Sequence, residues 1–146
     1  MQQITEKSST SSAMLREVEI MDVRKKLKVF LIEDSQRIRT VLIDMLHDTE
    51  QIEVVGFAEN EKDALKQLRA SEWDVAIVDI SLSEGNGLAV LAALQNDARD
   101  YGKRFVFTNH PTPALRTHSL KYGAEDFFDK SREMDLLVSR IRDLLH

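Results

Sequence analysis

Apolar residues along the chain follow two alternating patterns. Short continuous apolar runs are typical of buried strands, whereas apolar residues that recur every three or four positions are typical of helices. The continuous runs predict strands at residues 27–32, 52–58, 75–80, 104–108 and 127–128. The helical spacing predicts helices at residues 38–46, 64–68, 88–94, 114–122 and 136–145. The chain therefore reads as a series of strand–helix units.

The continuous apolar strands indicate the fold class. A strand that is apolar at every position must be covered on both faces, which is typical of a parallel sheet between helices. Right-handed crossovers then give an α/β fold with a doubly wound five-stranded parallel sheet. We expect one domain at residues 27–146.

Residues 1–26 form an N-terminal extension before this domain. The first dozen are polar and rich in Ser and Thr, which favours a flexible tail. Met14, Leu15, Val18 and Met21 then fall at helical spacing. The segment is either a flexible extension or a short helix that packs on the domain or on a second copy, which leaves a homodimer open.

Composition narrows the classes of function. The 146 residues contain no cysteine, so disulfides, thiolate catalysis and cysteine-ligated zinc are excluded. A net charge of −5 gives no general attraction to nucleic acid. We find no signal peptide, and the apolar runs are too short to span a membrane. We therefore expect a cytoplasmic protein that binds neither nucleic acid nor membrane.

Polar residues stand where the predicted strands end. Glu33 and Asp34 follow the first strand, Asp79 interrupts the third, Thr108 ends the fourth and Lys130 follows the fifth. Each has an ordinary explanation alone; Asp34, for example, suits a helix N-cap. Because the carboxyl ends of parallel strands meet at one edge of the sheet, all of these side chains should lie in one crevice.

Three carboxylates in one crevice need a cation. At an effective dielectric constant of about 20 they repel one another by several kcal/mol per pair. Mg²⁺ relieves this repulsion because it prefers oxygen ligands. Asp79 could then attack phosphorus as an oxygen nucleophile. Lys130 and Thr108 would supply positive charge and a hydroxyl to the phosphoryl oxygens.

The stretches around these residues resemble the receiver domain of two-component response regulators, the chemotaxis-type receivers included. They are FLIEDS (30–35), VDISLSEGNGL (78–88), FVFTNH (105–110) and GAEDFFDKS (123–131). They occur in the matching order and in the matching strand–helix units. The resemblance covers residues 27–146 and implies the flavodoxin-like (βα)5 receiver fold.

The resemblance also implies a phosphorylation site and a metal site. Asp79 would be the phosphorylated residue, and Lys130 would contact the phosphoryl group. Asp34 and Asp79 would bind Mg²⁺ directly and Glu33 through water. The backbone carbonyl of Ser81 would be a further ligand.

A switch and its partners are implied in the same way. Thr108 would move toward the phosphoryl group after transfer, and Phe127 matches the aromatic switch position. The donor would be a phosphohistidine on a sensor histidine kinase or a histidine phosphotransfer protein. Phosphorylation would shift an equilibrium that alters the surface around residues 114–145, which a downstream protein of unknown identity would bind.

The sequence departs from the family pattern at three positions. Ser131 replaces the proline that usually follows the lysine through a cis peptide bond. Asn109 replaces a small residue, and we hypothesise that it screens the phosphoryl group and slows its chemistry. Phe127 has no hydroxyl, so its switching must depend on packing alone.

Three functions compete at this stage. The leading one is a single-domain response regulator with no fused output domain, in which phosphoryl transfer and autodephosphorylation are self-catalysed and no other enzyme activity is expected. The second is a receiver-like interaction module that is never phosphorylated. The third is a phosphate-ester hydrolase with a phosphoaspartate intermediate, which would need an acid–base carboxylate at position 81, where the chain has Ser81.

Overall fold

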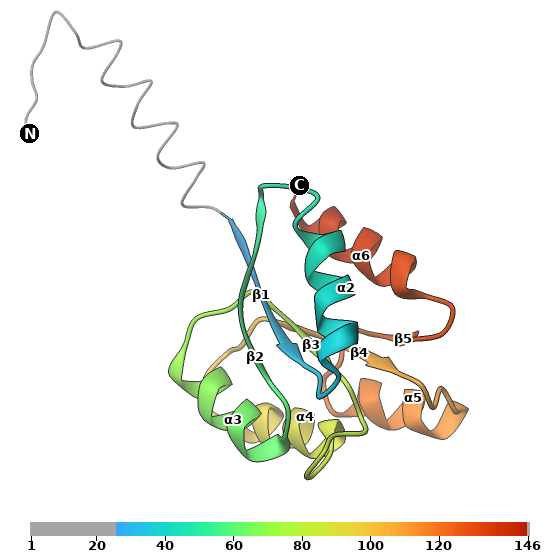
Figure 1. Cartoon of the computed structure of the whole chain (residues 1–146). Helices are drawn as coiled ribbons and strands as arrows, with labels where there is room; N and C mark the ends of the chain where they lie inside the picture. Colours follow the sequence, from blue (N-terminus) through green and yellow to red (C-terminus); the bar gives the residue numbers. More distant parts are fainter. Residues whose placement is uncertain (1–25, 146) are drawn as a thin grey trace, which may run out of the picture.

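The computed structural model describes residues 26–145, which form a parallel sheet between two layers of helices (Figure 1). The sheet has five parallel strands in the order β2-β1-β3-β4-β5. The strands are β1 (Leu27–Ile32), β2 (Ile52–Ala58), β3 (Val75–Val78), β4 (Lys103–Thr108) and β5 (Asp126–Asp129). The doubly wound α/β fold is therefore confirmed. The extension predicted at residues 1–26 lies outside the described residues, except for Lys26.

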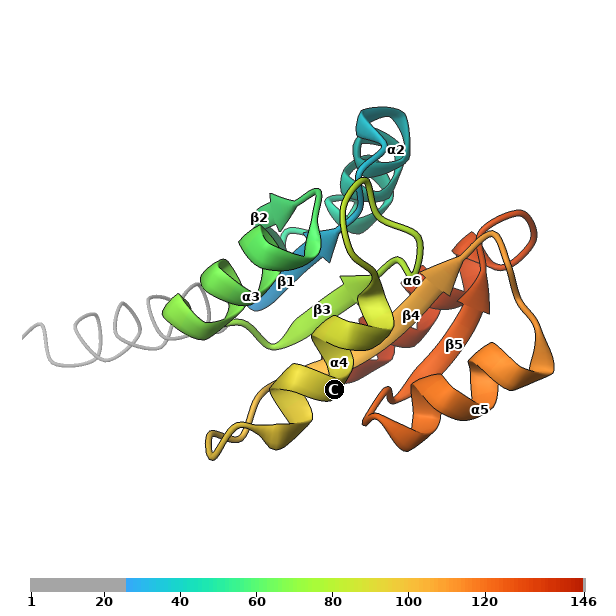
Figure 2. The same ribbon diagram turned by 90° about the horizontal axis from the view of Figure 1, so that it is seen from below.

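The helices divide between the two faces of the sheet. They are α2 (Gln36–Leu46), α3 (Glu61–Ala70), α4 (Gly87–Asn96), α5 (Pro113–Lys121) and α6 (Met134–Arg142), which the 3₁₀ turn η1 (Asp143–Leu145) follows. Helices α2 and α6 pack on one face, and α3, α4 and α5 pack on the other (Figure 2). Among the described residues, none of the helices combines the length and apolar character that crossing a bilayer requires.

Polar side chains define where most of these helices begin. The side chains of Ser35, Asn60, Asn86 and Thr112 each accept a hydrogen bond from a backbone N–H in the first turn of the following helix. Such N-caps satisfy donors that the helix itself leaves unpaired. The caps therefore set the points at which the chain turns from the sheet edge into each of these helices.

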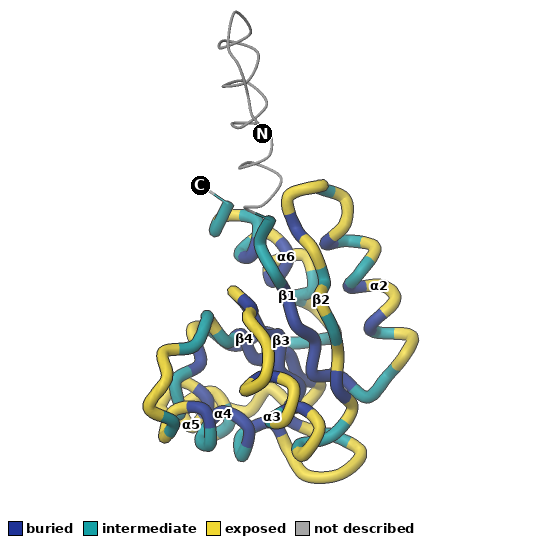
Figure 3. The backbone as a smooth tube through the Cα atoms, turned by 90° about the vertical axis from the view of Figure 1, so that its left-hand side faces the viewer, coloured by how far each residue is buried: buried dark blue, intermediate teal, exposed yellow. Residues whose placement is uncertain are grey.

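The core lies on both faces of the sheet, which explains the continuous apolar strands. Along β1, Val29 and Leu31 contact the α2 and α6 side, whereas Phe30 and Ile32 contact the other side. All four are buried, and the buried segments of the central strands run through the middle of the molecule (Figure 3). A strand between two helix layers has no solvated face, so polar residues are excluded until it reaches the sheet edge.

Most element boundaries differ from the sequence prediction by one to three residues, and two of these differences are informative. Strand β3 ends at Val78 rather than at residue 80, because the chain bends away toward α4. The Asp79 N–H still donates to the Ile32 carbonyl (2.9 Å), and the Ile80 carbonyl accepts from the Gly87 N–H (2.9 Å). The last helix begins at Met134 and tightens into a 3₁₀ turn after Arg142.

Gly87 allows α4 to start directly against the Asp79 backbone. A Cβ at this position would lie 2.1 Å from the Asp79 carbonyl oxygen and 2.8 Å from Val78 Cγ1. We expect Gly87→Ala to lower the free energy of unfolding by about 2 kcal/mol, because backbone rather than a side chain must move. Urea denaturation measures this.

Gly56→Ala is the matched control for this prediction. The nearest atom to a Cβ at Gly56 belongs to the Phe30 ring, at 3.0 Å, and a side chain can shift. Gly56→Ala should lower the free energy of unfolding by less than Gly87→Ala does. Equal decreases in the two variants would contradict the explanation.

Candidate functional site

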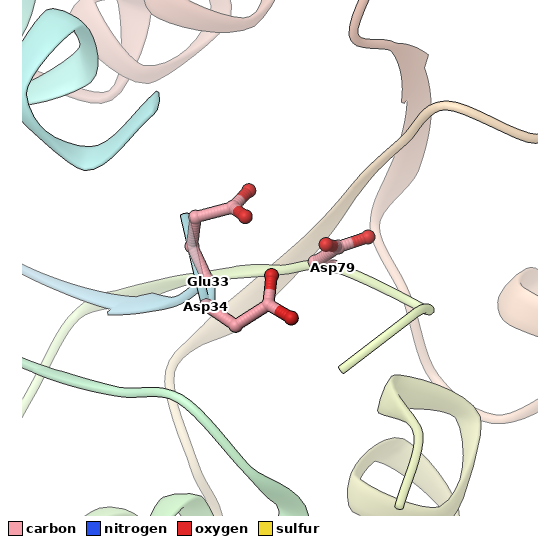
Figure 4. A group of neighbouring side chains, drawn as sticks. All are labelled: Glu33, Asp34 and Asp79. Atoms are coloured by element: carbon pink, nitrogen blue, oxygen red, sulfur yellow. The ribbon is translucent and has the colours of Figure 1, made fainter. Parts of the chain in front are cut away.

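Three carboxyl groups meet where two neighbouring strands end. Glu33 and Asp34 follow β1, and Asp79 follows β3, whose last residue Val78 pairs with Ile32. One carboxylate oxygen from each of the three side chains lies within 4.8 Å of the others. Figure 4 shows the three groups gathered at this edge of the sheet. At this separation one Mg²⁺ can be bound directly or through the waters that it keeps.

Lys130 is the counter-charge of the two most buried carboxylates. Glu33 and Asp79 are only 2% and 4% exposed, and Asp34 is the most open of the three acids. The Lys130 ammonium follows β5, and its Nζ lies 2.5 Å from Glu33 Oε1 and 2.8 Å from Asp79 Oδ2. The lysine side chain is itself only 6% exposed. Buried charges are stable only when paired, and this arrangement pairs all three.

Backbone donors hold the remaining oxygens of the buried carboxylates. The Ser81 N–H donates to Asp79 Oδ1 (3.2 Å), and the Ser35 N–H donates to Glu33 Oε2 (3.1 Å). In each buried carboxylate, one oxygen therefore contacts the Lys130 ammonium and the other accepts a hydrogen bond from a backbone N–H two residues further along the chain. These two bonds fix the rotation of both carboxyl groups.

The charge balance of the cluster is negative. Burial raises the pKa of Glu33, and the hydrogen bond from Lys130 opposes this rise only in part. Burial likewise raises the pKa of Asp79 against the same lysine. Burial alone would lower the pKa of Lys130, but its bonds to the two carboxylates outweigh that effect and raise it. Three carboxylates facing one ammonium fit a site that a divalent cation completes.

The cluster opens into a pocket of about 360 Å³. Asp34, Asp79 and Lys130 line it together with Asn109 and His110, which follow β4. A larger hollow of about 590 Å³ lies at the opposite edge of the sheet, but none of its ionisable lining residues is buried. We therefore place the chemistry in the smaller pocket.

Thr108 and Phe127 lie beside the pocket rather than in its lining. Thr108 is fully buried, and its Oγ1 accepts a hydrogen bond from the His110 N–H (3.3 Å). Its carbonyl accepts from the Lys130 N–H (2.9 Å), which ties the ends of β4 and β5 together. Phe127 is buried in the core layer that includes Val106 and Ala124. The structure thus brings Glu33, Asp34, Asp79, Ser81 and Lys130 together and leaves these two outside.

Ser131 shapes the loop that carries the lysine. The Lys130–Ser131 peptide bond is trans, as is every peptide bond among the described residues. Both the N–H and the hydroxyl of Ser131 donate to Asp129 Oδ1, at 2.8 and 2.7 Å. A proline here could supply neither donor, so the serine holds this loop in a different way.

Sequence reasoning missed Arg39, which lies beneath the acidic cluster. Its Nη1 donates to the Glu33 carbonyl (2.7 Å) and pairs with Glu59 Oε2 (2.9 Å). A signal was present in the sequence, because Arg39 falls on the same helical stripe as the buried residues Leu42 and Leu46. An arginine in an apolar stripe needs buried partners, and here they belong to the site.

The raised pKa of Asp79 predicts a stabilising substitution. A carboxyl with a higher pKa in the folded protein binds more protons when folded, so stability falls as pH rises through its unfolded pKa toward the folded one. Without Mg²⁺ near neutral pH, we expect Asp79→Asn to raise the free energy of unfolding by about 1 kcal/mol. Urea denaturation with a chelator, from about pH 5 to neutral, measures the difference.

Asp48→Asn is the control, because the Asp48 side chain is largely exposed and its pair with Arg142 is weak. It should leave the pH dependence of stability unchanged. A loss of stability in Asp79→Asn near neutral pH would show that the cluster does not hold excess negative charge.

Comparison with known proteins identifies the family. A model of the family described as "Response regulator receiver domain" matches residues 29–142. The protein-glutamate methylesterase/protein-glutamine glutaminase of Clostridium acetobutylicum is 32% identical over 127 residues, which cover 81% of this chain and 36% of that protein. The DNA-binding transcriptional activator DevR/DosR of Mycobacterium tuberculosis is 26% identical over 81% of this chain and 54% of its own. The chain thus spans about a third to a half of these relatives.

Solved structures share the fold. The signal receiver domain of the response regulator NarL from Mycobacterium tuberculosis superposes with a TM-score of 0.74 at 25% identity, covering 82% of this chain and 96% of that one. The response regulator domain of Thermotoga maritima CheB gives a TM-score of 0.72 at 23% identity, covering 81% and 95%. With the family match over residues 29–142, the conclusion is that this chain belongs to the response regulator receiver domain family.

Proposed function

We propose that this receiver accepts a phosphoryl group on Asp79 from a phosphohistidine donor, with Mg²⁺ bound beside it. The observation that carries the proposal is the surroundings of Asp79. Its carboxylate is held by Lys130 at 2.8 Å, and oxygens of Glu33 and Asp34 lie within 4.8 Å. Three charged groups from two other strand ends thus converge on the Asp79 carboxylate at the mouth of a pocket.

The donor set fits Mg²⁺ in a particular way. Both oxygens of Glu33 are already engaged, one by Lys130 and one by the Ser35 N–H, which favours contact through water. Asp34 is more open, which favours a direct contact. Both oxygens of Asp79 are engaged as well, so its direct contact follows from the family resemblance and not from this geometry. The backbone carbonyl of Ser81 completes the proposed set. When bound, the ion would supply positive charge that neutralises the acids and the phosphoryl oxygens.

The residues of the chain itself account for the transfer. An ionised oxygen of Asp79 forms the new bond to phosphorus as the bond between phosphorus and the donor's histidine nitrogen breaks. Burial raises the pKa of Asp79, and the hydrogen bond from Lys130 opposes that rise and so favours the charged form of the carboxylate. After transfer the same ammonium faces the added negative charge of the phosphoryl group. The Thr108 carbonyl accepts a hydrogen bond from the Lys130 N–H, so Thr108 lies near the site. After a local movement its hydroxyl would contact the phosphoryl group.

The proposed role is a signalling switch rather than an enzyme that turns over an external substrate. The partners would be a sensor histidine kinase or a histidine phosphotransfer protein, and then a downstream protein or a phosphorelay component, in the cytoplasm. Phe127 would transmit the change through packing, because it lies in the core beside α5 and has no hydroxyl. The methylesterase and DNA-binding activities named for the relatives belong to proteins that extend well beyond the matched region.

Phosphorylation of Asp79 can be tested by intact mass. With Mg²⁺ and a small phosphodonor such as acetyl phosphate, we expect the mass to increase by one phosphoryl group. The gain should vanish in Asp79→Asn and with a chelator, because the nucleophile or the cation is then missing. It should persist in Asp48→Asn, which removes an exposed aspartate outside the pocket.

Two other results would point elsewhere. No gain in the wild-type protein, with Mg²⁺ binding intact, would favour an interaction module that is not phosphorylated. Repeated turnover of phosphate esters would favour a hydrolase, although Ser81 stands where such an enzyme needs a carboxylate.

Asn109 is expected to control the lifetime of the phosphorylated form. It lines the pocket beside Asp79, where its amide can shield the phosphoryl group from water. We expect Asn109→Ala to speed dephosphorylation about threefold. The rate follows from intact mass after the phosphodonor is removed. Asn96→Ala, an exposed asparagine at the end of α4, is the control, and equal rates in all three proteins would refute the role.

A further inference from the structure

Arg39 is a buried arginine that contacts the main chain of the acidic cluster. Its guanidinium donates to the Glu33 carbonyl at 2.7 Å and forms an ion pair with Glu59 at 2.9 Å. It also stacks over the Phe57 ring, 4.1 Å from the ring centroid. The arginine side chain is only 9% exposed, whereas Glu59 is half exposed. An ion pair with a solvated partner does not by itself account for a buried guanidinium.

The hydrogen bond from Arg39 to the Glu33 carbonyl lies directly after the end of β1, where the pairing of the strand with its neighbours stops. The Glu33 N–H donates to the Ala58 carbonyl of β2, so the residue is held on its amino side. Its carbonyl belongs to the peptide unit that joins Glu33 to Asp34. Arg39 holds that carbonyl and therefore sets the orientation of the peptide between two of the proposed metal-binding residues.

A second set of bonds connects Arg39 to the loop after Asp79. Glu59, the partner of Arg39, lies in the β2–α3 loop, and its carbonyl accepts from Ser83 Oγ at 2.9 Å. The start of α3 is joined to the loop after Asp79 as well, because the Glu61 N–H donates to the Glu84 carbonyl at 3.0 Å. The side chain of Glu61 also accepts from the Asn86 N–H at 3.2 Å. The loop that begins at Asp79 is thus fastened to Glu59.

We propose that Arg39 is a positioning residue for the metal centre. Through Glu59 and Ser83 it links the end of β1 to the loop that follows β3. This link keeps Glu33 and Asp34 at a distance from Asp79 that one ion can bridge. Mg²⁺ tolerates little distortion of its coordination, and outer contacts of this kind tune metal affinity. This inference depends on the proposed function, because it assigns Arg39 a role toward the same ion.

Charge alone predicts the opposite effect, which makes the inference testable. Arg39 carries a positive charge near a site for a cation, so its removal should tighten Mg²⁺ binding if only Coulomb interactions matter. If Arg39 positions the acids, its removal should weaken binding. The direction of the change therefore separates the two explanations.

The experiment is a calorimetric titration of the full chain with Mg²⁺. We expect Arg39→Met, which keeps an apolar stem over Phe57, to raise the Kd for Mg²⁺ about tenfold. Ser83→Ala removes only the bond to the Glu59 carbonyl and should raise it about threefold. At saturating Mg²⁺ the phosphorylation rate of Arg39→Met should return to within about twofold of the wild-type rate, because the positioning defect lies in binding.

Arg140→Met is the matched control. Arg140 also pairs with a carboxylate, Asp126 Oδ2 at 2.6 Å, and lies over an aromatic ring, 5.5 Å from the Phe105 centroid. Within residues 26–145 Arg140 makes no hydrogen bond to the acidic cluster, so its loss should lower stability without changing the Kd. Denaturation curves of both arginine variants show how far stability alone accounts for any change.

The outcomes separate this inference from the function on which it depends. An unchanged or lower Kd in folded Arg39→Met would overturn the positioning role while the proposed function stands. If Arg39→Met does not fold, an unchanged Kd in Ser83→Ala would overturn it instead. Failure of the wild-type protein to bind Mg²⁺ at all would overturn the proposed function and the inference together.

Discussion

The pairing of one lysine with two buried carboxylates is the interaction on which the site depends. Glu33 and Asp79 come from different strands and are almost fully enclosed, so each would be costly as an isolated charge. Lys130 reaches both, and it comes from a third strand end. The ammonium cannot neutralise Asp34 as well, and the excess negative charge that remains is the basis for the proposed binding of a cation.

The topology of the sheet makes this meeting possible. Strands β1 and β3 are neighbours, and the chain leaves β1 and β3 at the same edge, where α2 and α4 begin on opposite faces. A crevice forms at such a point because the two crossovers diverge, and ligands of open parallel sheets bind there. Gly87 allows α4 to start against the Asp79 backbone, so the third acid stays close to the first two.

Residues around the acidic cluster hold its members in place through hydrogen bonds. The backbone position of Lys130 is fixed by the hydrogen bond from its N–H to the Thr108 carbonyl and by the two hydrogen bonds from Ser131 to Asp129. Arg39 performs a comparable task on the other side, where it holds the Glu33 carbonyl and Glu59. The proposed phosphoryl transfer depends on positioning and charge, so it would need such support, because small displacements of the acids would alter both metal binding and the nucleophile.

The sequence by itself determined the alternation of strands and helices, the parallel sheet, and the convergence of Glu33, Asp34, Asp79 and Lys130, because buried strands must be apolar and polar residues mark where they end. It did not determine that β3 stops at Val78 or that Thr108 and Phe127 lie outside the pocket lining, since these follow from how the loops pack. The contacts of Arg39 were decided only by tertiary structure. Its partners are a carbonyl and a glutamate from another loop, and no local pattern specifies which distant groups will meet a buried charge.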